Sequence, residues 1–200
     1  MKNIYLIGAS TRLGYQPHLK ELLLDKAHVD GPAVNCGDSA NIIEYLSEWL
    51  SGQSPHIICV TCGLHDLRYD ISKKTYQVPV ETYAQNLGTI FGMLKDLTAA
   101  KIFWQTNTPI LEDIYNNKPM IPGTQRIYHR FEKDVLAYNE AAQHVAMQHH
   151  LDIIDLYAVM VPLCEQYMLD DGIHWTDEGY KIMAREVAQA LSGELEKLGD

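Results

Sequence analysis

Residues 4–12 of the chain read Ile4-Tyr5-Leu6-Ile7-Gly8-Ala9-Ser10-Thr11-Arg12. A short apolar run ends on a glycine and is followed by small and polar residues. This pattern predicts a buried β-strand over about residues 3–8 with a turn after it. We interpret Ser10 as a nucleophile at the carboxyl end of that strand. Taken alone, the same serine could equally be a helix N-cap or part of a phosphate-binding turn.

The composition is that of one globular domain over residues 1–200. Of these residues, 46% are hydrophobic and 21% are charged, which suits a sizeable buried core. The net charge of −10 argues against a nucleic acid or an anionic membrane surface as partner, so we expect a small-molecule substrate. The N-terminus does not resemble a signal peptide and four cysteines do not make a disulfide scaffold, so we expect a cytoplasmic protein. The sequence leaves the oligomeric state open.

Strands and helices are predicted to alternate along the whole chain. After the first strand, further strands are predicted over residues 29–35, 56–62, 101–106 and 151–156, and helices over about residues 16–26, 39–52, 80–97, 129–150 and 176–196. Residues 63–79 and 108–126 are predicted to be loops, the latter because of Pro109, Pro119, Pro122 and Gly123. The alternation predicts an α/β fold with a parallel sheet and helices on both faces. Sites in such folds lie outside the carboxyl ends of the strands.

Polar segments follow the predicted strands at that edge. They are Gly8-Ala9-Ser10, Asn35-Cys36-Gly37-Asp38-Ser39, Gly63-Leu64-His65-Asp66, Thr106-Asn107-Thr108-Pro109 and Asp171-Gly172-Ile173-His174-Trp175. In content and order, with Gly179-Tyr180 after the last, they resemble the sequence blocks of the SGNH (GDSL-type) hydrolase superfamily. Within it, a small bacterial subgroup with Gly-Leu-His-Asp in the third block is similar. The resemblance implies a three-layer α/β/α, flavodoxin-like fold with a five-stranded parallel sheet.

The resemblance implies a catalytic role for Ser10, His174 and Asp171. A serine hydroxyl needs a base, and an imidazole titrates near neutrality. Asp171 precedes His174 by three residues, so it can hold the ring tautomer and stabilise the imidazolium. The backbone N–H groups of Ser10 and Gly37 are the implied oxyanion-hole donors. No metal and no organic cofactor is expected.

Two positions differ from the usual family pattern. Ala9 stands where the family has Asp, and we expect the serine to be presented nonetheless. His65 stands where the family has an oxyanion-binding Asn, and we interpret it as a variant donor that would be stronger if protonated. Asp66 is expected to brace its loop by hydrogen bonding.

Several other side chains near the predicted site are possible substrate-binding groups. Trp175 could pack against a sugar ring or an acyl group. An anionic or sugar group of the substrate could be held by Arg12, Arg68, Arg126, His129 and Arg130. The competing interpretations are exposed charge or salt bridging for the arginines and core packing for the tryptophan.

Cys59 and Cys62 form a C-x-x-C motif inside the apolar run of the predicted third strand. Redox motifs of this spacing begin a helix, whereas residues three apart on a strand point to opposite faces. We therefore predict buried structural thiols.

These observations predict a serine esterase that works through an acyl-enzyme, with an acetyl group on a carbohydrate or small molecule as the expected substrate. A lysophospholipase or thioesterase would use the same mechanism. A non-catalytic SGNH-like protein that binds a carbohydrate or metabolite is the alternative from another class, because Ala9 and His65 alter the predicted oxyanion hole. A flavodoxin-like phosphate binder is a weaker alternative, since residues 8–14 fit no common phosphate-loop pattern.

Overall fold

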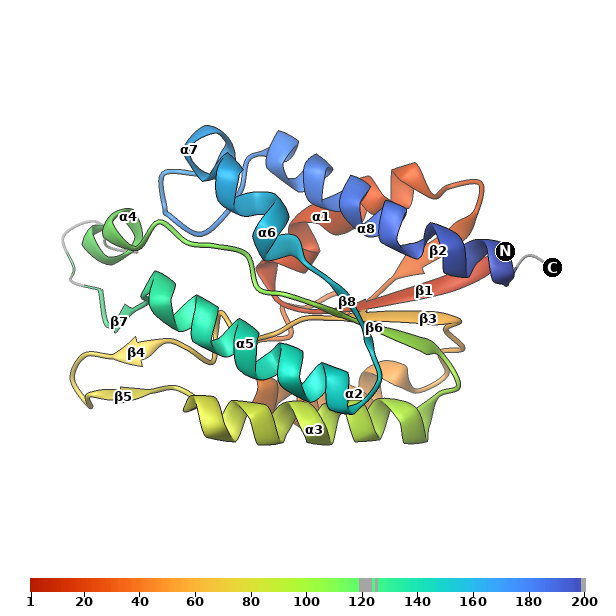
Figure 1. The fold of residues 1–200 in the computed structure, drawn as a ribbon, viewed down its shortest axis with the longest axis horizontal. Coiled ribbons are helices and arrows are strands. Elements are labelled where there is room, and N and C mark those ends of the chain that lie inside the picture. Colours follow the sequence, from red (N-terminus) through yellow and green to blue (C-terminus); the bar gives the residue numbers. More distant parts are fainter. Residues whose placement is uncertain (119–123, 125, 199–200) are drawn as a thin grey trace.

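A computed structural model describes residues 1–118, 124 and 126–198 of the chain (Figure 1). Its centre is a five-stranded parallel sheet with the strand order β2-β1-β3-β6-β8. The strands are β1 (Lys2–Ile7), β2 (Ala27–Asp30), β3 (Ile57–Val60), β6 (Lys101–Gln105) and β8 (Asp152–Ile154). The sheet confirms the predicted fold class, although each strand is shorter or shifted relative to its predicted range.

Helices cover both faces of the sheet (Figure 1). One face packs against α1 (Ser10–Leu22), α6 (Leu156–Met160) and α8 (Asp177–Lys197), and the other against α2 (Ser39–Leu50), α3 (Val80–Leu97) and α5 (Glu132–Gln148). Alternate residues of β1 pack into the cores on the two faces of the sheet. Ile4 and Leu6 pack on the face of α1 and α8, and Tyr5 and Ile7 pack on the opposite face. Burial on both faces explains why the central strands β1 and β3 contain continuous apolar runs.

The two predicted loops contain regular structure. Residues 63–79 include β4 (Tyr69–Asp70) and β5 (Thr75–Tyr76), which form a small antiparallel sheet with β7 (Tyr128–His129). Residues 108–126 include α4 (Glu112–Asn117). Farther along the chain, two short elements that were also not predicted follow α6: η1 (Val161–Leu163) and α7 (Cys164–Tyr167). Elements of two to six residues are too short to show a periodic pattern, so the loop predictions were wrong in these places. Pro119, Pro122 and Gly123 lie outside the described residues.

Two predicted helix starts need correction. The first helix begins at Ser10, six residues before the predicted start at residue 16, and Pro17 lies inside it instead of opening it. Proline lacks only one amide hydrogen bond, and here packing of the helix outweighs that loss. The second helix is capped by Asp38, whose side chain accepts from the Asn41 amide at 2.9 Å. Ser39, the predicted cap, is the first residue of that helix.

The cysteine prediction is confirmed. Cys59 belongs to the core beneath α1 and α8, whereas Cys62 belongs to the core on the opposite face. All four cysteines are free and buried. Among the described helices, none is long and apolar enough to cross a membrane.

The first and last long helices, α1 and α8, pack side by side on one face of the sheet (Figure 1). Gly14 on α1 lies against the ring of Tyr180 on α8, and a Cβ at Gly14 would come within 2.3 Å of that ring. Glycine therefore permits the close approach. Because Ser10 begins α1 and His174 lies just before α8, this contact sets the spacing of the two residues.

We expect Gly14→Ala to lower the free energy of unfolding by about 1–3 kcal/mol, because the Tyr180 ring has to shift to admit the methyl group. Chemical denaturation measures this change. Gly193→Ala on α8 is the matched control, since nothing lies within 4 Å of its added Cβ. The control should be stabilised by up to about 1 kcal/mol from helix propensity. A Gly14→Ala protein as stable as the control variant would contradict the close contact.

Candidate active site

Ser10 lies at the junction between β1 and α1. The strand ends at Ile7, and Gly8 and Ala9 form the turn into the helix. Ala9 occupies the N-cap position with extended backbone and makes no side-chain capping bond. The amide groups of the first helical turn have no partner within the helix, so they carry partial positive charge at this edge of the sheet. The turn thus presents Ser10 without the Asp that the family usually has at residue 9.

Ser10, His174 and Asp171 form a continuous hydrogen-bonded line. Ser10 Oγ lies 3.0 Å from His174 Nε2, and His174 Nδ1 lies 2.7 Å from Asp171 Oδ2. A carboxylate accepts hydrogen bonds, so Nδ1 carries the ring proton and Nε2 accepts from the serine hydroxyl. The structure brings these three residues together across 164 positions of sequence.

The loop that carries the acid and the base is tightly held. Burial alone would raise the pKa of Asp171, but hydrogen bonds from the His174 amide, the His174 ring and the Ile173 amide outweigh burial and lower that pKa. Gly172 has φ +74°, in the left-handed region that favours glycine, and its carbonyl accepts from the Leu111 amide at 2.9 Å. Asp171 is therefore an ionised, fixed partner for His174.

The three predicted oxyanion donors differ in availability. The Ser10 amide has no acceptor among the described residues. The Gly37 amide donates to Asn35 Oδ1 at 3.0 Å, so Asn35 has to release it before it can serve a substrate. Asn35 was not singled out from the sequence for this role. The signal for it was the spacing Asn-x-Gly, which is typical of a side chain that closes a turn onto the amide two residues later.

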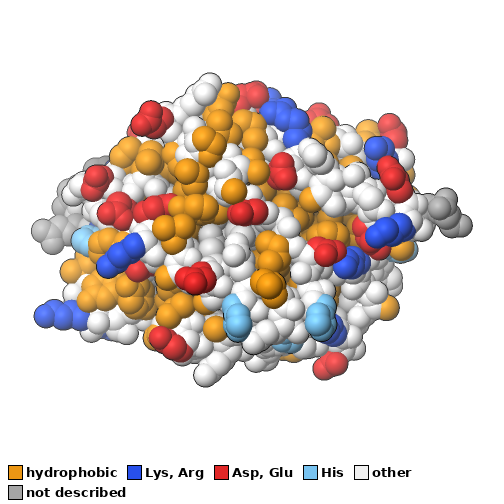
Figure 2. All heavy atoms as spheres, viewed as in Figure 1, with side chains coloured by type: hydrophobic (Ala, Val, Ile, Leu, Met, Phe, Trp, Pro, Cys, Tyr) orange, Lys and Arg blue, Asp and Glu red, His pale blue; other side chains and the backbone are white. Residues whose placement is uncertain are grey.

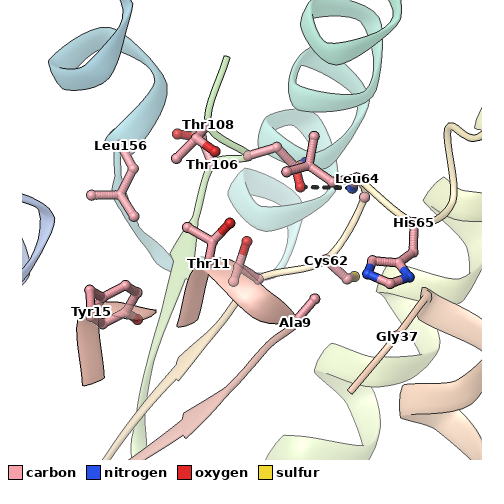
Figure 3. Close-up of a pocket in the computed structure, with 13 residues that line it drawn as sticks. Ala9, Thr11, Tyr15, Gly37, Cys62, Leu64, His65, Thr106, Thr108 and Leu156 are labelled. Atoms are coloured by element: carbon pink, nitrogen blue, oxygen red, sulfur yellow. Dashed lines mark hydrogen bonds between the residues drawn. The ribbon is translucent and has the colours of Figure 1, made fainter. Parts of the chain in front are cut away.

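His65 lies in the loop after β3, and Figure 3 shows its ring near Gly37 and Cys62. Burial lowers its pKa to about 3, and the positive charges of Arg68 and Arg130 act in the same direction. The ring is therefore neutral near pH 7. His65 is therefore not in the protonated state that would make it a stronger donor, because burial and the nearby positive charges both disfavour the imidazolium. A neutral imidazole can still donate one hydrogen bond.

Asn107, which the sequence interpretation did not assign, fixes the loop that carries His65. Its Oδ1 accepts from the Leu64 amide at 3.1 Å, drawn as a dashed line in Figure 3. Its own amide and side chain donate to Asn139 Oδ1 at 2.8 and 3.0 Å. A Cβ at Gly63 would come within 2.3 Å of Asn107 Nδ2. The sequence signal for this role of Asn107 was its position as a polar residue directly after the fourth predicted strand.

Asp66 anchors the same loop to α2. Its carboxylate accepts from the Ser39 amide at 3.0 Å and from the Ser39 hydroxyl. Burial raises its pKa to about 6, although the Ser39 bonds act in the opposite direction. The bracing interpretation of Asp66 is confirmed, with Ser39 as the partner.

Two of the predicted substrate-binding residues, Arg12 and Trp175, do not reach the surface of the site. Arg12 is 1% exposed and its guanidinium donates to the carbonyls of Gly8 and Val34, so it braces the turn beneath Ser10. Trp175 is 1% exposed and packs in the core between the sheet and α8. Both substrate-binding interpretations therefore need correction. Arg68 is partly exposed and remains a candidate.

A small cavity flanks the serine turn (Figure 3). Its volume is about 20 Å³, roughly the space of one water molecule. Besides Gly37 and His65, its lining consists largely of small side chains and glycine: Ala9, Thr11, Thr61, Gly63, Thr106 and Thr108. The Thr108 hydroxyl is buried without a partner among the described residues. The site thus offers room for a compact polar or methyl-sized group.

The neutral state of His65 predicts a pH dependence of stability. In the unfolded chain a histidine takes up a proton near pH 6.5, whereas folded His65 does so near pH 3. Between these values the unfolded state binds more protons, so the free energy of unfolding contributed by His65 falls as the pH falls. Asp66, whose pKa is raised to about 6, contributes in the opposite direction between about pH 4 and 6.

Replacing His65 by Asn removes the first contribution and leaves the second. We therefore expect wild type to lose stability relative to His65→Asn as the pH is lowered from 7 to 4.5, measured by denaturant unfolding at each pH. If the difference in free energy of unfolding between the two proteins stays constant over this range, the lowered pKa of His65 is contradicted.

Comparisons with known proteins agree with this geometry. Residues 8–187 match the family model described as GDSL-like Lipase/Acylhydrolase. A GDSL esterase/lipase of Arabidopsis thaliana is 30% identical over 147 residues, which are 72% of this chain and 61% of that protein. The chain thus spans about three fifths of the length of this relative. The fold is similar to a lipase/acylhydrolase from Enterococcus faecalis (TM-score 0.79, 19% identity, 97% of each chain). It is also similar to an acetyl xylan esterase (TM-score 0.75, 16% identity, 94% of this chain and 99% of that one). The match over most of the chain shows that the protein belongs to the GDSL-like lipase/acylhydrolase family, within the SGNH hydrolases that its sequence blocks resemble.

Proposed function

We propose that the protein is a serine esterase that hydrolyses a small-molecule carboxylic ester through an acyl-enzyme. The observation that carries this proposal is the line from Ser10 Oγ to His174 Nε2 to Asp171, with distances of 3.0 and 2.7 Å. Each distance is that of a hydrogen bond, so the base contacts the nucleophile and the acid contacts the base.

In the first half-reaction, Ser10 Oγ attacks the ester carbonyl carbon while His174 Nε2 takes the hydroxyl proton. The tetrahedral intermediate collapses, the bond to the alcohol oxygen breaks, and His174 returns the proton to the leaving alcohol. In the second half-reaction, His174 takes a proton from water, whose oxygen attacks the acyl carbon. The bond between that carbon and Ser10 Oγ then breaks, His174 returns the proton to Ser10 Oγ, and the acid is released. Asp171 stabilises the imidazolium in both steps.

The negative oxygen of the intermediate needs preformed donors. The Ser10 amide lies at the N-terminus of α1, where the helix dipole also favours negative charge. The Gly37 amide becomes a second donor when Asn35 releases it, and the neutral ring of His65 is a third. A non-catalytic carbohydrate- or metabolite-binding protein is a less well supported alternative, because it would not require the aligned triad or the free Ser10 amide.

We propose that the acyl group is short and that the substrate is an acetyl ester of a carbohydrate or small molecule. The small cavity beside the serine supports this proposal, since its lining leaves little space for a longer chain. The proteins of similar fold include an acetyl xylan esterase and a mutant of an acetyl-xylooligosaccharide esterase from Geobacillus. Membership in the small bacterial subgroup and a cytoplasmic location stay predictions.

Removal of either partner of the central hydrogen bond tests the mechanism. Ser10→Ala and His174→Ala should each lower kcat for 4-nitrophenyl acetate by at least about a thousandfold, because the nucleophile and its base act as one unit. Ser47→Ala, which changes an exposed serine on α2, is the matched control and should keep the wild-type rate. Equal rates in wild type and the two site variants would refute esterase activity at this site.

The acyl group is tested with 4-nitrophenyl esters of two, four, eight and sixteen carbons. If the cavity receives the acyl group, kcat/KM should be highest for acetate and fall by about tenfold or more by eight carbons, because extra methylenes have to displace packed side chains. Initial rates at matched substrate concentrations measure the series. A kcat/KM that rises with chain length would instead favour the lysophospholipase or thioesterase alternative.

A further inference from the structure

Three arginines converge on the edge of the candidate active site that carries His65. Arg126 and Arg130 lie over the ring of Tyr115, with Cζ to ring-centroid distances of 3.7 and 4.6 Å. Arg130 Nε donates to the carbonyl of Leu64, the residue before His65, at 2.6 Å. Arg68 follows His65 by three residues and lies 5.8 Å from the ring of Tyr128.

Arg130 lies close enough to Arg68 and to Arg126 for their positive charges to repel its own. Burial, together with these two charges, lowers the pKa of Arg130 to about 10, while Tyr115 acts in the opposite direction. Aromatic faces offset part of this repulsion, because a ring face attracts a cation. Holding like charges together nevertheless costs free energy, which an anion bound between them would recover.

No carboxylate supplies that anion within the described part of the chain. None of the ion pairs within 4.0 Å involves Arg68, Arg126 or Arg130. Residues 119–123 and 125, which are not described, contain no Asp or Glu. Acidic side chains are spread over the face in Figure 2, in keeping with the net charge of −10. The arginine cluster is therefore a local excess of positive charge on an acidic protein.

Donors remain free in this cluster. Arg130 is buried and uses Nε and Nη1 for the Leu64 carbonyl and the Tyr115 hydroxyl, so it fixes the Tyr115 ring over which Arg126 also lies. Among the described residues, Arg126 donates only through Nε, to the Lys118 carbonyl at 2.8 Å. The side chain of Arg68 makes no hydrogen bond to the described residues. Arg68 and Arg126 are both partly exposed, so their remaining N–H groups can reach a ligand.

We infer that Arg68, Arg126 and Arg130 form a subsite for an oxyanion group, such as a carboxylate, on the alcohol part of the ester. The planar guanidinium fork matches a carboxylate in two parallel hydrogen bonds. We assign the oxyanion group to the alcohol part of the ester because the proposed function places the acyl group in the small cavity beside the serine turn. The inference rests on the proposed esterase function, and it names the substrate class as esters of anionic alcohols.

The test compares two acetate esters of nearly equal shape, 4-acetoxybenzoate and the neutral 4-acetoxybenzamide, with 4-acetoxybenzenesulfonate as a second oxyanion. The proteins are wild type, Arg68→Gln and Arg126→Gln. In wild type at low salt, kcat/KM should be at least about tenfold higher for the carboxylate than for the amide. In each variant this ratio should fall by at least about fivefold, because a charge-assisted bond is lost. Arg185→Gln on the exposed side of α8 is the matched control and should keep the wild-type ratio.

If the wild-type kcat/KM is as high for the sulfonate ester as for the carboxylate ester, the subsite binds oxyanions in general. If it is higher for the carboxylate ester than for both other esters, the subsite is specific for a carboxylate. A wild-type ratio near one, or a ratio that is equal in wild type and both variants, overturns the inference while esterase activity stands.

A binding measurement separates the inference from the proposed function. Dissociation constants of 4-hydroxybenzoate and 4-hydroxybenzamide are measured by calorimetry on the inactive Ser10→Ala protein, with and without Arg68→Gln. If 4-hydroxybenzoate binds more tightly than 4-hydroxybenzamide, and Arg68→Gln weakens its binding by about fivefold or more, the subsite is supported even if no ester is hydrolysed. Equal binding of the two alcohols overturns the subsite, whatever the activity.

Discussion

The contact between α1 and α8 is the constraint on which the candidate active site depends. Ser10 is the first residue of α1, and two residues separate His174 from the start of α8, so neither residue positions the other locally. Gly14 lets the two helices approach until the ring of Tyr180 fills the space where a side chain would be. The 3.0 Å bond between Ser10 and His174 is then a consequence of helix packing. A sequence motif of three separated residues becomes a catalytic arrangement only because the first and last helices share one face of the sheet.

The sequence was sufficient for the elements whose physical signal is local. Apolar runs marked the first and third strands, and α3 was predicted with its observed bounds because its apolar residues recur at helical spacing. The order of polar blocks after the strands then placed Ser10, Asp171 and His174 at one edge, since parallel strands bring their carboxyl ends together. The roles of the three residues came from the resemblance of these blocks to those of the SGNH hydrolases.

What the sequence could not provide depends on contacts between distant segments. Pro17 was taken as a helix start, because the packing that keeps α1 continuous through it involves α8, far along the chain. Arg12 was taken as a surface cation, yet the carbonyls of Gly8 and Val34 hold it in the interior. The charge state of His65 follows from burial and from Arg130, which lies 65 positions later in the sequence. Residue type alone does not fix a side chain's environment.

The arginine cluster also accounts for how a histidine can stand where the family has an asparagine. An asparagine side chain is a neutral donor, and burial together with Arg68 and Arg130 keeps His65 neutral as well. An anion bound to the arginines would offset their charge and leave burial as the main influence on the ring. The pKa of His65 would then rise, which makes the protonated ring, the stronger hydrogen-bond donor, easier to form. A substrate with its own negative charge would in this way couple the proposed subsite to the donor strength of His65, whereas an asparagine at this position has no protonation state to shift.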